Sequence, residues 1–86
     1  MAEDDRVRIR AYLTALLRDQ DDTAPFGDMT SLISTGRLDS LAVIKLVTFL
    51  ETEFGVDFTQ IEFDPQRFDS LASLADVVDD WRQAGG

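Results

Sequence analysis

Cysteine and histidine are absent from this 86-residue sequence, and lysine occurs only once. Without cysteine the chain has no disulfide framework and no thiol nucleophile, and without either residue the usual zinc sites are excluded. Without histidine it lacks the side chain whose ordinary pKa best suits a general base near neutral pH. We therefore expect a protein that is not an enzyme by itself and that binds no metal.

Long apolar runs are also lacking, since no stretch of 18 residues is apolar enough to span a bilayer. The first five residues include three acids, whereas a secretory signal peptide begins with basic residues. The length suits one domain covering residues 1–86. We therefore expect a monomeric, cytoplasmic domain that is not bound to a membrane.

Acidic residues outnumber basic ones by 17 to 8, which gives a net charge of −9. A chain this acidic does not bind the phosphate backbone of nucleic acids through charge. The acidic excess lies entirely after residue 19, because residues 1–19 contain four acids and four arginines. Such a surface favours basic protein partners, although acidic residues that serve only solubility would give the same count.

Three stretches repeat apolar residues at the spacing of an α-helix. They run from about residue 3 to 19, from 40 to 54, and from 71 towards the glycines at 85–86. Their inward faces are Ile9, Tyr12, Leu13, Leu16 and Leu17, then Val43, Leu46, Val47, Leu50 and Phe54, then Leu71, Leu74, Ala75, Val78 and Trp81. Because no run of useful length alternates with period two, the sequence predicts an all-α domain.

The connection between the first two helices, residues 20–39, is long for a compact domain, and loops of this length are usually functional. Leu32 and Ile33 can anchor it to the core. After the second helix, Asp64 and Pro65 predict a short helical turn, with Asp64 as the N-cap. Four neighbouring side chains should pack beneath this turn: Phe58, Ile61, Phe63 and Phe68. The prediction is three principal helices, one short helix and a long first loop.

The second helix begins just after Gly36, and either Asp39 or Ser40 can serve as its N-cap. A phosphate ester on the Ser40 hydroxyl would lie over the free N–H groups and the positive end of the helix dipole, which stabilise negative charge. The simpler interpretation is a plain capping serine. Ser40 is therefore a candidate modification site.

Next to Ser40, the second helix is apolar over more than half its circumference, whereas a surface helix needs only a stripe. Leu41, Ile44, Lys45 and Thr48 share the face opposite the core, and we call these four residues the docking strip. An exposed apolar strip beside a modifiable serine is typical of a surface that binds a partner. The alternative is that the long loop covers this strip.

The sequence Leu38-Asp39-Ser40-Leu41 resembles the phosphopantetheine attachment region of acyl and peptidyl carrier proteins. The resemblance covers roughly residues 5–82, including the long loop before Gly36 and the run 68–74 that opens the last helix. Further along the second helix it includes Val43, Ile44, Leu46, Val47, Leu50, Glu51, Phe54 and Gly55. It implies the fold of those proteins, an acyl-carrier-like four-helix bundle.

The resemblance also implies a cofactor and partners. In that family a phosphopantetheinyl transferase esterifies the serine, here Ser40 flanked by Asp39 and Leu41, with 4′-phosphopantetheine from coenzyme A. The terminal thiol of this arm holds an acyl or aminoacyl group as a thioester, which explains why the chain needs no cysteine. The partners implied are the transferase, an acyl- or aminoacyl-loading enzyme, and a downstream transferase or synthase.

Three positions depart from the family pattern. Carriers of primary fatty-acid synthesis usually have acidic residues two and five positions after the serine, where this chain has Ala42 and Lys45. This difference predicts a dedicated set of partners, as in specialised metabolism. Phe49 replaces a residue that is commonly small, so its ring either fills space that a fatty acyl chain would occupy or packs under the loop.

A discrete carrier is the function that these residues favour, and a domain excised from a larger synthase is one alternative. The other is an acidic helical interaction module without a prosthetic group, which would show regularly spaced surface carboxylates.

The tripeptide Asp-Ser-Leu occurs twice, at residues 39–41 and 69–71, so the tripeptide alone does not choose the site. Ser70 opens a helix whose outward positions are polar, namely Ser73, Asp76, Asp79 and Asp80. Only Ser40 precedes a helix with an additional apolar strip. We predict that Ser40 is the attachment residue and that Ser70 is a helix-start residue.

Overall fold

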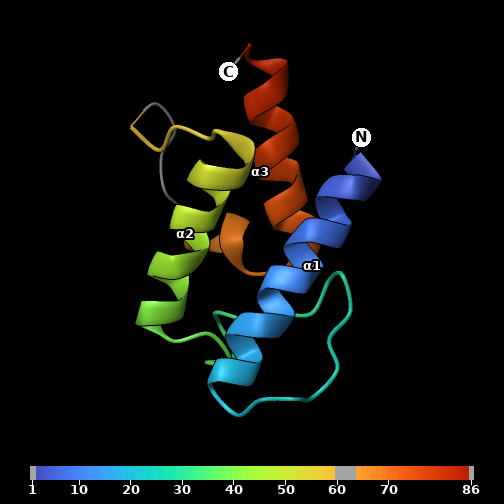
Figure 1. The fold of residues 1–86 in the computed structure, drawn as a ribbon, viewed down its shortest axis with the longest axis vertical. Coiled ribbons are helices and arrows are strands. Elements are labelled where there is room, and N and C mark those ends of the chain that lie inside the picture. Colours follow the sequence, from blue (N-terminus) through green and yellow to red (C-terminus); the bar gives the residue numbers. More distant parts are fainter. Residues whose placement is uncertain (1, 60–63, 86) are drawn as a thin grey trace.

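The computed structural model describes residues 2–59 and 64–85. Its elements are α1 (Ala2–Asp19), α2 (Ser40–Phe54), the short 3₁₀ helix η1 (Pro65–Phe68) and α3 (Leu71–Gln83). The part of the chain that is described contains no strand, so the predicted all-α fold is confirmed, with the short helix as a 3₁₀ turn. The loop after α1 runs around one end of the molecule, and the start of α1 and the end of α3 lie at the other (Figure 1). Within these ranges, no helix is long and apolar enough to cross a bilayer.

All three α-helices contribute side chains to one hydrophobic core. The buried residues of the helices are Ile9, Leu13, Leu16 and Leu17 from α1, Ala42, Leu46 and Leu50 from α2, and Leu71, Leu74, Ala75, Val77 and Val78 from α3. In α2 the innermost row therefore begins at Ala42, whereas Val43 and Val47 are only partly buried. A helix that is apolar over half its circumference leaves several rows equally able to face inward, and the packing against α1 and α3 selects one.

The short helix η1 forms as predicted, because the Asp64 side chain accepts a hydrogen bond from the Gln66 N–H at 3.0 Å. Phe68, the last residue of η1, is buried in the core, and the Phe58 ring lies against the Phe68 ring with 5.5 Å between centroids. The other two aromatic and aliphatic residues predicted to pack here, Ile61 and Phe63, lie outside the described residues.

The ends of three helices meet at Arg82. Both Nη atoms of Arg82 donate to the carboxylate of Asp5 in α1, and Asp5 is only 4% exposed. The same guanidinium lies 5.7 Å from the centroid of the Phe54 ring at the end of α2. Paired hydrogen bonds of this kind are among the stronger polar contacts in proteins, so Arg82 ties the end of α3 to both other helices.

The long loop is held to the start of α3 by the carboxylate of Asp69. Its Oδ1 accepts the backbone N–H groups of Leu32, Ile33 and Ser34 at 3.1, 2.7 and 2.9 Å, and its Oδ2 accepts the Ser34 hydroxyl at 3.0 Å. Beside these contacts the Leu32 side chain is fully buried. The predicted anchoring of the loop through Leu32 and Ile33 is thus confirmed, and a carboxylate completes it.

The hydrogen bonds around Asp69 also set its acidity. Burial alone raises the pKa of Asp69, but hydrogen bonds from Ser34, Ile33 and the Ser31 hydroxyl outweigh it and leave the pKa below its ordinary value. The folded state therefore favours the ionised carboxylate more than the unfolded chain does. This stabilising contribution is complete above the ordinary pKa and is lost as the pH falls through the lower pKa of the folded state.

We therefore predict that Asp69→Ala lowers the free energy of unfolding at neutral pH by about 2 kcal/mol, because several hydrogen bonds to a charged group are lost. The variant should also lose less stability than the wild type between neutral pH and about pH 3. Urea unfolding at several pH values measures both effects. Asp76→Ala is the control, because Asp76 is an exposed carboxylate on α3, the helix that begins two residues after Asp69. Equal acid sensitivity in wild type and Asp69→Ala would contradict the assignment.

Candidate functional site

The geometry at the start of α2 distinguishes the two candidate N-cap residues, Asp39 and Ser40. Asp39 has extended backbone angles, and its carboxylate accepts the Ala42 N–H at 2.8 Å, so Asp39 is the N-cap. Ser40 is then the first helical residue. It is exposed, and its hydroxyl forms no hydrogen bond with any other residue that the structure describes. The Ser40 hydroxyl is therefore free to react.

A helix leaves its first four backbone N–H groups without partners inside the helix. At α2 the Ala42 N–H donates to the Asp39 carboxylate, and the Asp39 N–H donates to Oε1 of Gln20 at 3.3 Å. The N–H groups of Ser40 and Leu41 find no acceptor in the described parts of the chain. The two unoccupied donors thus belong to the serine and to the residue after it.

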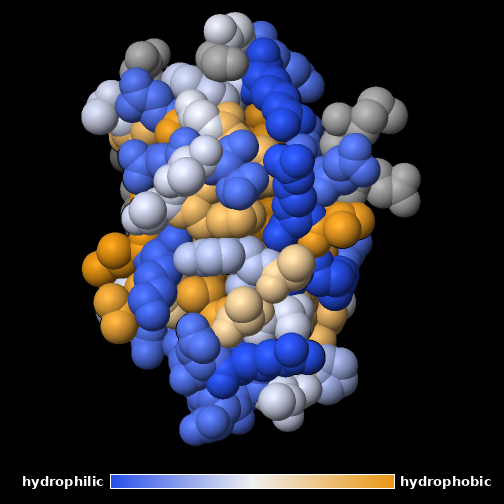
Figure 2. Space-filling model, viewed as in Figure 1, coloured by the Kyte–Doolittle hydropathy of each residue, from blue (hydrophilic) through white to orange (hydrophobic). Residues whose placement is uncertain are grey.

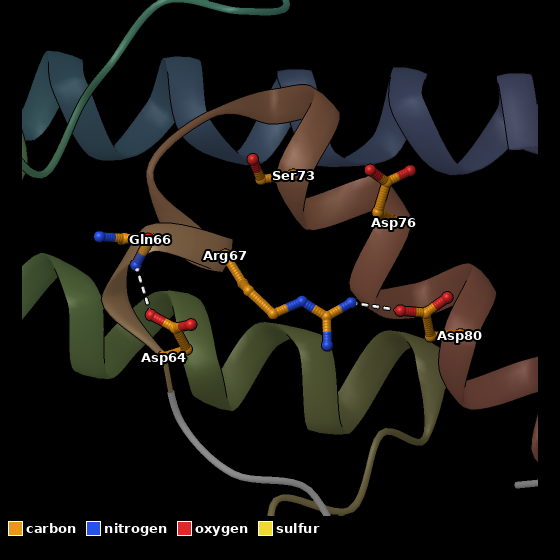
Figure 3. Close-up of a pocket in the computed structure, with 6 residues that line it drawn as sticks. All are labelled: Asp64, Gln66, Arg67, Ser73, Asp76 and Asp80. Carbon is orange, nitrogen blue, oxygen red and sulfur yellow. Dashed lines mark hydrogen bonds and ion pairs between the residues drawn. The ribbon is translucent and has the colours of Figure 1, made fainter.

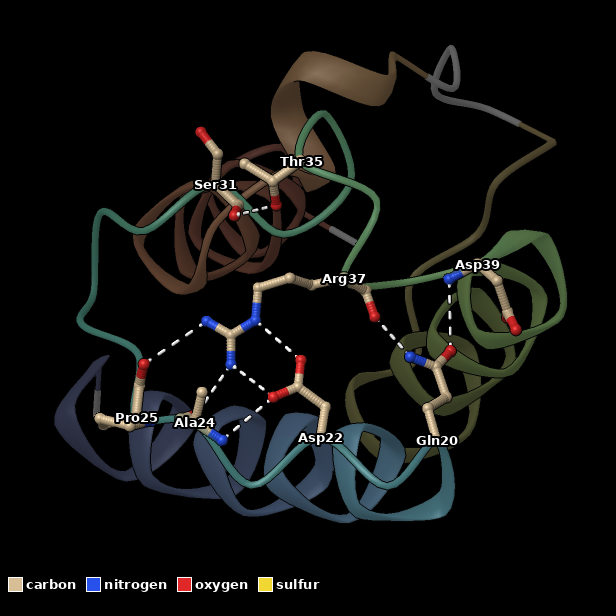
Figure 4. A network of polar contacts seen from close by, with 8 residues as sticks. All are labelled: Gln20, Asp22, Ala24, Pro25, Ser31, Thr35, Arg37 and Asp39. Carbon is tan, nitrogen blue, oxygen red and sulfur yellow. Dashed lines mark hydrogen bonds and ion pairs between the residues drawn. The ribbon is translucent and has the colours of Figure 1, made fainter.

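The loop before Ser40 is organised by Arg37 (Figure 4). Its guanidinium donates to the Asp22 carboxylate at 2.9 and 3.2 Å, and to the carbonyl oxygens of Ala24 and Pro25. The hydrogen bond from Arg37 is the main cause that lowers the pKa of Asp22. Gly36, with φ of 78°, makes the turn that aims Arg37 back across the loop. The chain that leads to α2 is therefore fastened to the residues that follow α1.

The second Asp-Ser-Leu tripeptide is used differently. Ser70 is only 6% exposed and is the N-cap of α3, where its Oγ accepts the Ser73 N–H at 3.2 Å and lies 3.0 Å from the Ser73 hydroxyl. The Asp69 carboxylate is occupied by the loop. The prediction that Ser70 is a helix-start residue agrees with this geometry, and the two serines differ in both exposure and hydrogen bonding.

The docking strip faces solvent. Leu41 and Ile44 are 60% and 62% exposed, and Lys45 and Thr48 are exposed beside them. Hydrophobic side chains protrude at the edge of the molecule where α2 lies (Figure 2). The alternative in which the long loop covers this strip is therefore wrong, because the loop is drawn towards α3 by Asp69 instead.

Two residues singled out beside the docking strip do not belong to it. Ala42 is 4% exposed and points into the core, so a side chain at this position does not face a docked partner. The Phe49 ring stacks on Tyr12 of α1, with centroids 4.1 Å apart and planes 8° apart, and it contacts the edge of Phe54. Phe49 thus lies in the interface between α1 and α2 rather than under the loop.

A polar groove of about 400 Å³ lies between η1 and the outer face of α3 (Figure 3). Arg67 pairs there with Asp80, and Asp64 is used as the cap of η1. Among the described residues, no three acidic side chains are placed to hold a metal ion. The contacts of Arg67 and Asp64 in this groove therefore stabilise η1 and its packing against α3.

One family model matches most of the chain. Residues 8–79 match the family described as the phosphopantetheine attachment site. The chain belongs to this family. No curated protein and no solved structure matches the chain significantly.

Members of this family are carrier domains, and their cofactor is 4′-phosphopantetheine. Such domains are in general not catalytic, and they are modified by a phosphopantetheinyl transferase. The start of α2 suits this group, because it offers an exposed hydroxyl and two N–H donors that form no hydrogen bond with the residues that the structure describes.

Sequence reasoning missed Gln20, which contacts the backbone directly before Ser40. The residue three positions after the N-cap could have indicated that a distant acceptor was needed. A glutamate or glutamine there would bond the N-cap N–H and close a capping box, but this chain has Ala42. The Asp39 N–H therefore needed an acceptor from elsewhere in the fold.

The two serines should respond differently to truncation. We predict that Ser70→Ala lowers the free energy of unfolding by about 1 kcal/mol, because a helix cap is lost. Ser40→Ala should change it by less than about 0.5 kcal/mol, because its hydroxyl makes no contact to lose. Urea unfolding of the two variants measures the difference. A larger loss for Ser40→Ala than for Ser70→Ala would show that the hydrogen bonding at the two helix starts is misassigned.

Proposed function

We propose that this chain carries an acyl or aminoacyl group as a thioester on a 4′-phosphopantetheine arm attached to Ser40, and delivers it to partner enzymes. The observation that carries the proposal is the free, exposed Ser40 hydroxyl at the first position of α2 in a member of the phosphopantetheine attachment family. Family membership favours this function over that of an acidic interaction module without a prosthetic group.

The local electrostatics of α2 support a phosphodiester at Ser40. The first turn of α2 contains no acidic residue, and the positive end of the helix dipole favours an anion there. The free N–H groups of Ser40 and Leu41 are suitable donors for phosphate oxygens. Asp39 is the nearest carboxylate in the sequence, and its Oδ1 is committed to the Ala42 N–H. When bound, the arm supplies the thiol that this chain lacks.

The docking strip is proposed to bind the transferase and the enzymes that load and unload the arm. Its apolar residues, Leu41 and Ile44, suit the desolvated centre of an interface. Lys45 forms no ion pair with a described residue, so its charge is available to a partner. A lone lysine at this position of an acidic carrier favours partners with a matching acidic group, which supports a role in specialised metabolism.

Modification at Ser40 is directly testable. We predict that incubation with coenzyme A and a broad-specificity phosphopantetheinyl transferase raises the intact mass of the protein by one arm. Ser40→Ala should abolish this change, because the reacting hydroxyl is gone. Ser70→Ala, which alters the same tripeptide elsewhere, should be modified like the wild type at a temperature where it remains folded. Intact-protein mass spectrometry measures all three, and an arm on Ser40→Ala would refute the assignment.

The docking strip predicts a separate effect on affinity. Ile44→Asp should raise KM for arm transfer roughly tenfold, because a charge replaces an apolar contact at the centre of the interface. The control is Val7→Asp, since Val7 is similarly exposed at 64% but lies on α1. Initial rates at varied carrier concentration measure the effect. Equal KM values for the two variants would count against the docking strip.

A further inference from the structure

The side-chain amide of Gln20 bridges two backbone groups directly before Ser40 (Figure 4). Its Nε2 donates to the carbonyl oxygen of Arg37, and its Oε1 accepts the Asp39 N–H at 3.3 Å. One partner is an acceptor and the other a donor, so the orientation of the amide is fixed by chemistry. Leu38, between the two bonded residues, is buried. Residues 37–39 are therefore held by the hydrogen bonds to Gln20 and by the burial of Leu38 in the core.

The bridge replaces a contact that helices often make within their own first turn. In a capping box, the side chain three residues after the N-cap accepts the N–H of the N-cap residue. Here that position is Ala42, which has no acceptor and is buried. Gln20, the residue directly after α1, accepts this N–H instead. The backbone angles of the N-cap thus depend on a residue nineteen positions earlier.

The consequence for Ser40 follows from its position after the N-cap. The orientation of Asp39 determines how α2 begins, and hence where the Ser40 hydroxyl points. Gln20 accepts the Asp39 N–H, and the Asp39 carboxylate accepts the Ala42 N–H. The N–H groups of Ser40 and Leu41 are then the donors available to a phosphate. We propose that Gln20 is a positioning residue for the transfer of the arm to Ser40, an inference that rests on the proposed function.

The transfer of the arm requires that the Ser40 oxygen be placed correctly for attack on phosphorus. The Ser40 oxygen attacks the phosphorus that bears the pantetheine in coenzyme A, so that a new O–P bond forms and the pyrophosphate P–O bond breaks. Adenosine 3′,5′-bisphosphate leaves, and the hydroxyl proton passes to a base of the transferase. Such a displacement is sensitive to the placement of the attacking oxygen. Gln20 touches none of the reacting atoms and acts by holding the backbone.

The test compares arm-transfer kinetics of three variants with the wild type. Gln20→Ala removes both hydrogen bonds, and Gln20→Glu keeps the acceptor for the Asp39 N–H but loses the donor to Arg37. Asp22→Asn is the structural control, because it weakens the contact with Arg37 and leaves the Gln20 bonds in place. For each variant, kcat and KM for arm transfer, the thermal midpoint and the hydrogen exchange rate of the Asp39 amide are measured.

We expect Gln20→Ala to lower kcat about fivefold with little change in KM, since the loss of one or two modest hydrogen bonds has this magnitude and the docking strip is intact. Gln20→Glu should recover most of kcat, and the Asp39 amide should exchange faster in Gln20→Ala only. Asp22→Asn should leave kcat within about twofold of the wild type even where its thermal midpoint falls equally.

Two results would overturn the inference. One is an unchanged kcat in Gln20→Ala. The other is a loss of kcat that follows the thermal midpoint equally in Gln20→Ala and Asp22→Asn, which would mean that Gln20 only stabilises the fold. Failure of the proposed function itself looks different, because the wild type would then gain no arm or Ser40→Ala would still gain one. If Gln20→Ala does not fold, Gln20→Leu takes its place, because leucine keeps the bulk of the side chain and lacks both hydrogen-bonding groups; an unchanged kcat in Gln20→Leu would overturn the inference.

Discussion

The carboxylate of Asp69 supplies the constraint that holds the loop before α2 in place. A loop of twenty residues without regular structure is entropically costly to hold in one conformation, and here a single oxygen gathers three consecutive N–H groups of that loop. The end of the loop is in turn bonded to this anchored segment, because the Leu38 N–H donates to the Leu32 carbonyl oxygen at 2.9 Å. Leu38 is buried directly before the Asp39 cap. The start of α2 is thus connected to the start of α3 through hydrogen bonds and one buried leucine.

The two Asp-Ser-Leu tripeptides are identical in sequence, but their side chains form different hydrogen bonds in the fold. At residues 69–71 the aspartate binds the loop and the serine caps a buried helix start, so both side chains are committed to the fold. At residues 39–41 the aspartate is the cap, and the serine moves one position into the helix. In this position, neither the Ser40 hydroxyl nor the Ser40 N–H forms a hydrogen bond within residues 2–59 and 64–85.

Most of the basic residues of this chain pair with acids of the same chain. Six arginines form ion pairs with acids of the same chain, and three of these pairs join α1 to the loop or to α2. Exposed pairs of this kind add little stability each, but they neutralise much of the basic charge inside the molecule. Lys45 forms no ion pair with the described residues and lies on the docking strip. The docking strip of this acidic chain therefore carries one positive charge that is not neutralised by an acid among the described residues.

The amino-acid sequence by itself determined the helices, because apolar spacing and capping residues are local signals: α2 begins and ends at the predicted residues, and η1 begins at the predicted cap. It also identified Ser40 as the candidate, since a glycine turn, a cap and an outward apolar strip are adjacent in the chain. Only the tertiary structure decided that Asp39 rather than Ser40 is the cap, that Ala42 is the innermost residue of its turn, and that Gln20 and Asp69 fasten the loop. The contacts of Gln20 and Asp69 join residues 17 to 37 positions apart, and no local pattern specifies which distant donor meets which acceptor once the core has packed.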